Sequence, residues 1–214
     1  MIGPYTFDAR TGRYRSAAGR FVKAAQVKDV TLSTFDRAAD GALTLAKRLQ
    51  SGEISLAEWQ LGMAAEIKHA SLYSAAMANG GWANLSQADF GRVGQWLAHG
   101  PAGGRGQYEY LRAFAKEIEA GLPLDGRFLR RSRMYVLQAN QYFERERGRA
   151  NAVRGFDQVR SVRHARDSCE GCITQAAKGW QDREAYVWPG NRDCLTACRC
   201  STTHRNSSTG DIAA

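Results

Sequence analysis

The sequence predicts a mainly α-helical protein: a helical body with an extended N-terminal arm and a small, C-terminal, cysteine-rich β-hairpin module. Apolar residues recur at spacings of three and four through the middle of the chain. Glycines interrupt the first residues too often for a helix. All five cysteines fall within 32 residues near the end. We expect an arm over 1–30, a helical domain over 31–150, an arginine-rich linker and cysteine-rich knuckle over 151–205, and a flexible tail over 206–214.

The composition is that of a chain with a hydrophobic core. Of its 214 residues, 43% are hydrophobic and 10% are aromatic, which argues against wholesale disorder. No apolar run approaches the ~20 residues that span a bilayer, so we expect no membrane segment. The polar, basic start does not resemble a signal peptide, so we do not expect secretion. An odd number of cysteines in a reducing compartment weakens the case for a disulfide framework.

The net charge of +9 is concentrated in two segments. Residues 1–28 hold six lysines or arginines against one acid, and residues 127–166 hold eleven arginines against three acids. These basic segments flank a mildly acidic remainder and suggest a polyanionic partner at both ends. Solvated helix faces are the alternative explanation.

The N-terminal arm alternates glycines with aromatic and basic residues. The pieces Gly12–Arg15 and Gly19–Val22 favour turns or a small hairpin over a helix. Such a segment could dock on another protein or fold back onto its own body, and the sequence leaves both open. The candidate partner-binding residues of the arm are Tyr5, Phe7, Tyr14, Arg15, Arg20 and Phe21.

The helical domain divides into five predicted helices. The first runs from about Thr31 or Ser33 to Gln50, with its apolar residues on one face. The second begins with the capping box Ser55–Glu58, in which the hydroxyl and the carboxylate bond the first free N–H groups. The others are expected over about 85–97, 108–118 and 124–145.

The last of these helices carries the candidate nucleic-acid-binding residues. Arginines crowd its first two turns, where the helix dipole does not favour cations. That placement suggests an anion outside the helix, either phosphate or an acidic neighbour. The apolar pattern fades by Arg145, and the stretch to Arg166 is interpreted as a linker or an irregular helix. The candidates are Arg127, Arg130, Arg131, Arg133, Arg145, Arg147 and Arg149.

The cysteines have the spacing of a metal knuckle. Two short-spaced groups, Cys-x2-Cys and Cys-x3-Cys-x-Cys, are separated by 21 residues, and each group can supply neighbouring thiolates to one tetrahedral ion. Four protein ligands would make a structural zinc site, and metal binding would then contribute folding free energy. A disulfide pair or reduced thiols are the alternatives. The candidate ligands are Cys169, Cys172, Cys194, Cys198 and Cys200, with His164 and His204 in reserve.

The chain offers little material for catalysis, and we do not expect an enzyme. A zinc deaminase would need His-x-Glu before its cysteines, and the sequence has none. A nuclease of the HNH kind would need histidines beside the cysteine pairs with acidic partners. Only four histidines occur in the whole chain.

These motifs resemble the C-terminal signature of tailed-phage minor head proteins, the head morphogenesis proteins similar to the phage Mu F protein family. The resemblance rests on the two cysteine groups, the aromatic stretch between them, Pro189-Gly190 and the closing Cys198-Arg199-Cys200. It is strongest over 124–201 and looser over 31–123. Upstream it includes Ser55-Leu56-x-x-Trp59, Gly80-Gly81, Tyr108-x-Tyr110-Leu111-x-x-Phe114 and Arg131-x-Arg133-Met134-Tyr135.

The resemblance implies a structural virion component near the portal vertex that assists procapsid assembly, DNA packaging or DNA delivery. Its partners would be the portal protein or the major capsid protein, with non-specific contact to packaged DNA and a possible homo-oligomer. Its location would be the phage head, and the host cytoplasm during assembly. Two alternatives remain: a zinc-knuckle DNA-binding regulator and an HNH-like nuclease. The near-neutral charge between Cys172 and Cys194 argues against the knuckle as a DNA reader.

Overall fold

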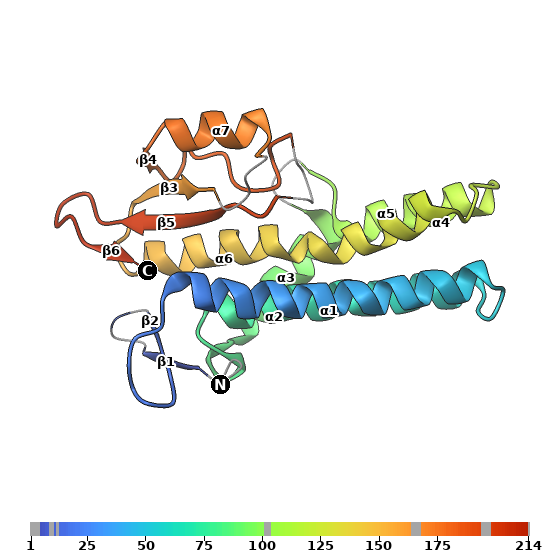
Figure 1. Cartoon of the computed structure of the whole chain (residues 1–214), viewed down its shortest axis with the longest axis horizontal. Helices are drawn as coiled ribbons and strands as arrows, with labels where there is room; N and C mark the ends of the chain where they lie inside the picture. The colour runs from blue at the N-terminus through green and yellow to red at the C-terminus, as the bar shows by residue number, and fades with distance from the viewer. Residues whose placement is uncertain are drawn as a thin grey trace. The chain divides into compact units, whose positions relative to one another are not determined.

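The computed structural model is mainly helical, with a small C-terminal strand region that contains a cysteine cluster, as the sequence predicts (Figure 1). It describes residues 5–8, 11, 13–100, 104–163, 168–193 and 198–213. The chain forms two compact units. The sheet unit comprises Met1–Leu32, Ser74–Asn84 and Asn140–Ala214, and the helical unit comprises Ser33–Tyr73 and Leu85–Ala139.

The helical unit is built around an aromatic core. Trp59, Phe114 and Phe128 are fully buried, and their ring centroids lie 5.6 to 5.8 Å apart. Such tilted and edge-on pairs add to the stability from apolar burial. The apolar stripes of the sequence therefore do form the core. Its helices come from parts of α1 (Ala24–Gln50) and α2 (Leu56–Ala78), with α3 (Gln87–His99), α4 (Gln107–Glu119) and α5 (Gly126–Leu137).

Two helices of this unit, α2 and α3, begin at capping boxes. The predicted capping box is present: the N–H of Ser55 donates to Glu58 Oε2 at 2.7 Å, and the N–H of Glu58 donates to Ser55 Oγ at 3.2 Å. The bond from the Ser55 N–H, followed by one from the Ser55 hydroxyl at 2.8 Å, holds the pKa of the Glu58 carboxyl below its usual value. A second box joins Ser86 to Asp89 at the start of α3. In the described part of the chain, no helix combines the length and the apolar character that a bilayer crossing requires.

Two helix boundaries differ from the prediction. Helix α1 starts at Ala24 rather than near Thr31, because the Gln26 side chain accepts from the Lys23 N–H and Thr31 is itself buried in the helix. The predicted helix over 124–145 is instead α5 followed by α6 (Ala139–Val153). Helix α6 continues beyond Arg145, where the apolar pattern fades. The pattern fails there because several buried positions of the helix hold polar side chains.

The sheet unit contains a short hairpin and a four-stranded antiparallel sheet. Strands β1 (Thr6–Asp8) and β2 (Arg13–Arg15) pair in the hairpin. The sheet has the order β4-β3-β5-β6, and α7 and α6 run beside it (Figure 1). The strand bounds are β3 Gln158–Val162, β4 Gln181–Asp182, β5 Ser201–Arg205 and β6 Ile212–Ala213, and α7 covers Glu170–Ala177.

The segments expected to be a linker and a flexible tail contain two of these strands. Strand β3 lies in the predicted linker, and its register with β5 pairs Val159 with His204. The chain from 206 to 213 makes a turn and returns as β6, with Ala213 buried. The Asn206 side chain nucleates this turn, since its Oδ1 accepts from the N–H groups of Ser208 and Thr209. The prediction of a frayed tail is wrong for these residues.

Candidate metal centre

Three buried cysteines meet between α7 and the start of β5. The Sγ atoms of Cys172, Cys198 and Cys200 all lie within 4.8 Å of one another, and these residues are 1%, 2% and 4% exposed. Cys172 lies in the first turn of α7, whereas Cys198 and Cys200 directly precede β5. The fold therefore brings the two sequence groups together, as their spacing predicts.

The sulfur geometry fits a tetrahedral ion. Zinc–thiolate bonds of about 2.3 Å place neighbouring sulfurs of a tetrahedron about 3.8 Å apart. The Sγ atoms of Cys172 and Cys198 lie 3.8 Å apart. A disulfide would need about 2.05 Å, so these two sulfurs are not joined by one. The donor set is three soft thiols, which suits zinc better than a hard cation such as magnesium.

The remaining candidate ligands are placed as follows. Cys169 is the N-cap residue of α7, half-buried, and packs against the three clustered cysteines. His204 does not join the cluster, because its Nε2 lies 3.0 Å from Thr202 Oγ1. Cys194 and His164 lie outside the described residues.

The backbone around the cluster is fixed by three side chains. The Asn140 amide donates to the Cys198 carbonyl at 2.7 Å, which holds the second cysteine group against α6. Asp193 accepts from the Gly171 N–H at 2.7 Å, which ties the preceding loop to α7. Buried Arg192 approaches Cys172 Sγ at 3.7 Å. Nothing in the sequence pattern marks Arg192 for this place, since it is one basic residue in a near-neutral loop.

Electrostatics at the cluster favour a bound cation. The hydrogen bond with Cys198, followed by burial, raises the pKa of the Cys200 thiol well above its usual range. Closely spaced thiolates repel one another, and a metal ion removes that repulsion. The N-terminus of α7 also favours negative charge at Cys169 and Cys172. The cluster is therefore suited to bind a metal rather than to remain as free thiolates.

A buried polar network supports the strand that follows the cluster. Glu144 is fully buried on α6, and its Oε2 accepts from the Thr202 N–H at 3.0 Å and from Thr202 Oγ1 at 2.8 Å. Arg147 lies 3.4 Å from the same oxygen and also donates to the Thr202 carbonyl. Burial lowers the pKa of His204 to about 3. Nothing in the sequence marks Glu144 for this role, because an acid in a helix without an apolar stripe is expected to be exposed to solvent.

Of the predicted nucleic-acid-binding arginines of α5, two are exposed, and the two half-buried ones pair with acids. Arg127 is 91% exposed in its side chain and lies 3.1 Å from Asp125, the N-cap residue. Arg130 is also exposed. Two others pair within the helical unit: Arg131 with Glu117 at 2.9 Å, and Arg133 with Asp40 at 3.2 Å.

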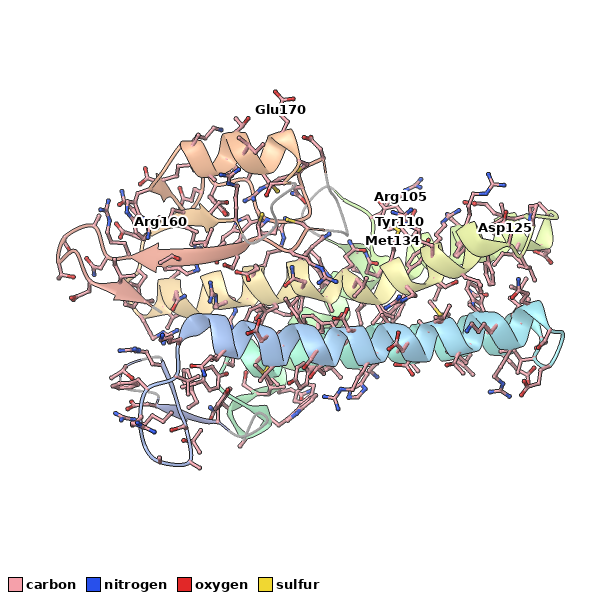
Figure 2. All side chains as sticks on the ribbon, in the orientation of Figure 1. Arg105, Tyr110, Asp125, Met134, Arg160 and Glu170 are labelled. Atoms are coloured by element: carbon pink, nitrogen blue, oxygen red, sulfur yellow. The ribbon has the colours of Figure 1, made fainter. Side chains whose placement is uncertain are left out.

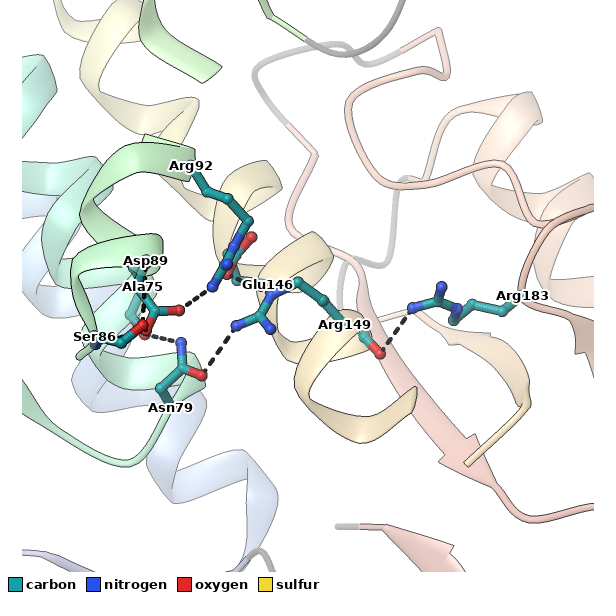
Figure 3. Close-up of polar contacts among 9 residues, drawn as sticks. Ala75, Asn79, Ser86, Asp89, Arg92, Glu146, Arg149 and Arg183 are labelled. Carbon is teal, nitrogen blue, oxygen red and sulfur yellow. Dashed lines mark hydrogen bonds and ion pairs between the residues drawn. The ribbon is translucent and has the colours of Figure 1, made fainter. Parts of the chain in front are cut away.

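Two of the three candidate nucleic-acid-binding arginines of α6, Arg147 and Arg149, have partners within the sheet unit. Arg149 lies 3.1 Å from Glu146 and donates to Asn79 Oδ1 at 3.2 Å, both within the sheet unit (Figure 3). Arg147 pairs with Glu144, as described above. Burial lowers the pKa of Arg145. Arg147 and Arg149 therefore help to hold the sheet unit together, because Glu144 and Glu146 lie within ion-pair distance and oxygens of Thr202 and Asn79 accept their hydrogen bonds.

The arm folds back onto the sheet unit. Tyr14 is buried, its hydroxyl donates to the Met77 carbonyl, and its ring packs 5.2 Å from that of Phe7. Phe7 lies so close to Gly80 that any Cβ there would fall 2.1 Å from its ring. These contacts favour an arm that folds back over one in which Phe7 and Tyr14 dock on another protein.

The other arm residues lie nearer the surface. Arg15 is bound to Asp8 at 2.7 Å and stacks 3.9 Å above Phe21. Phe21 is 39% exposed, Arg20 is exposed and Tyr5 is half-buried.

Comparisons of the chain with protein-family models, with curated proteins and with solved structures found no match.

Proposed function

We propose that the chain is a structural minor head protein of a tailed phage, similar to the phage Mu F protein family, whose C-terminal cysteines bind one structural zinc ion. The observation that carries the metal assignment is the meeting of three buried thiols within 4.8 Å of one another, two of them 3.8 Å apart. The head-protein assignment is supported by the motif resemblance and by the charge of +9. Both parts can be tested separately.

Burial favours a structural over a catalytic role for the metal. A catalytic zinc keeps one position open to water or substrate. Here the three clustered cysteines are no more than 4% exposed, so a reactant would have no approach past their side chains. Cys169, which packs against the cluster, is the proposed fourth ligand. When bound, zinc would supply a cross-link between α7 and the start of β5, segments that are 26 residues apart at Cys172 and Cys198.

Contact with packaged DNA would be non-specific and electrostatic. The proposed groups are the exposed arginines Arg127 and Arg130 of α5 and Arg160 of β3, which is labelled beside the sheet in Figure 2. Guanidinium groups bind phosphates without reading sequence, and such binding weakens as salt rises. The exposed arm residues Arg20 and Phe21 are the proposed contact with the portal or the major capsid protein.

The metal is tested on the recombinant full chain. Elemental analysis should find about one zinc per chain in the parent and in Thr174→Ser, a control at an exposed position of α7. Cys172→Ser should lose the metal, and protease should then cleave the region after residue 166. A folded, zinc-free parent whose protease resistance is unchanged by Cys172→Ser would contradict the structural metal site.

The head-protein role is tested on particles. Mass spectrometry of purified phage particles from the producing host should detect the chain, and it should co-purify with portal assemblies. Its absence from particles would overturn this role. Sequence-selective binding of a duplex by the isolated chain would favour the regulator, and metal-dependent cleavage of plasmid DNA would favour the nuclease.

A further inference from the structure

Arg192 is a buried cation beside the cysteine cluster. Its side chain donates to the Val187 carbonyl from Nε at 3.0 Å and from Nη2 at 2.7 Å. The same Nη2 lies 2.8 Å from Ser161 Oγ and 2.7 Å from Tyr186 OH. The residue is only 5% exposed. Its remaining terminal nitrogen, Nη1, points to Cys172 Sγ at 3.7 Å.

The acceptors around Arg192 accept its hydrogen bonds but do not neutralise its positive charge. Hydroxyls and a carbonyl are neutral, and so is the Tyr186 ring, whose centroid lies 5.4 Å from the guanidinium carbon. No carboxylate of the described residues lies within ion-pair distance of Arg192. An arginine stays protonated in proteins, and burying a charge without an opposite charge is costly. Of the groups that Arg192 meets, the thiol of Cys172 is a stronger acid by type than the phenol of Tyr186 and carries a negative charge when it binds a metal.

We propose that Arg192 is the counter-charge of an anionic metal–thiolate centre. This inference rests on the proposed zinc site and specifies its charge. Zinc carries two positive charges, so three thiolate ligands leave the centre at −1 and four leave it at −2. The N–H···S bond and the fixed positive charge of Arg192 offset that excess. The centre therefore holds at least three thiolates, and Arg192 positions and stabilises Cys172 without binding the metal itself.

The test separates charge from packing with two variants of the full chain. Arg192→Lys keeps the charge and loses the fork of donors, whereas Arg192→Gln keeps donors and loses the charge. Zinc affinity is measured by competition with a chromophoric chelator. We expect a fall of about 10- to 100-fold for Arg192→Gln, the range seen when groups that support metal ligands are removed. Arg192→Lys should stay much closer to the parent.

A second measurement reports on electron donation by the thiolate sulfurs. In the cobalt-substituted chain, the sulfur-to-cobalt charge-transfer band should move to lower energy in Arg192→Gln, because a thiolate without its counter-charge donates electrons more readily. Tyr186→Phe is the matched control, since it removes one hydroxyl neighbour of Arg192 and leaves the charge; its band should match the parent. Equal losses of affinity in the lysine and glutamine variants, or an unchanged band in Arg192→Gln, would overturn the inference. A parent chain that binds neither zinc nor cobalt would overturn the metal site itself.

Discussion

Replacing Glu144 tests whether the buried network beside the cluster stabilises the sheet unit. Glu144→Ala would leave the Thr202 N–H and hydroxyl without their acceptor and would remove the carboxylate 3.4 Å from Arg147. Glu144→Gln keeps the shape and one acceptor oxygen but loses the charge. Arg147 remains partly solvated, with its side chain 17% exposed, which moderates the effect.

The magnitude follows from these contacts. Breaking a buried charged pair by removing one partner costs about 3–5 kcal/mol. We therefore expect Glu144→Ala to lower the free energy of unfolding by about 3–5 kcal/mol, and Glu144→Gln by about 1–3 kcal/mol, the cost of weakening a hydrogen-bonded buried group. Because Thr202 follows Cys200 by two residues, metal affinity should fall with the alanine variant as well.

The assay is urea denaturation of the full chain followed by circular dichroism, with zinc present. Glu184→Gln is the matched control: Glu184 is an exposed acid of the same unit, and its loss should change stability by less than about 0.5 kcal/mol. If both Glu144 variants fell within that margin, the network would not stabilise the fold and the reasoning would be refuted.

Two further predictions concern backbone strain and pH. Gly190 has φ +93°, and a Cβ there would fall 1.9 Å from the buried Gln141 side chain, so Gly190→Ala should cost about 2–5 kcal/mol in thermal or urea unfolding. Gly210→Ala, at φ +76° with open space around it, should cost only about 1–2 kcal/mol, and equal losses would contradict the close contact at Gly190. Burial lowers the pKa of His204 to about 3, against about 6.5 in the unfolded chain, so between these pH values the unfolded state binds one more proton. The free energy of unfolding should then fall by up to about 1.4 kcal/mol per pH unit as the pH drops below 6.5, and His204→Gln should remove that part of the slope in parallel titrations. An identical slope in the variant would show that His204 is not buried in neutral form.

The sequence predicted those features that depend on local spacing. The capping box at Ser55 needs only a hydroxyl and a carboxylate three residues apart, and it is present. The apolar stripes that place Trp59 and Phe114 in the core follow from helical periodicity. The meeting of Cys172 with Cys198 follows from paired thiols on either side of a loop.

Features that depend on partners distant in sequence were not predictable. Arg147 and Arg149 looked available for phosphate, but Arg147 donates to Thr202, 55 residues away, and Arg149 donates to Asn79, 70 residues away. Helix α6 looked irregular because the groups it buries are polar, and a polar residue reveals its burial only through its partner. Arg192 gave no signal for the same reason.

The sheet unit is assembled from three separate stretches of chain, and this has a consequence for its synthesis. Its first stretch ends at Leu32, whereas the last cysteine of the cluster is residue 200. At about 5–20 residues per second, a ribosome needs on the order of 10 to 30 s to travel between them. Throughout that interval Phe7 and Tyr14 have been synthesised, whereas the complete set of strands of their unit has not. The proposed metal can therefore be bound by all of its ligands only late, after translation has delivered Cys200.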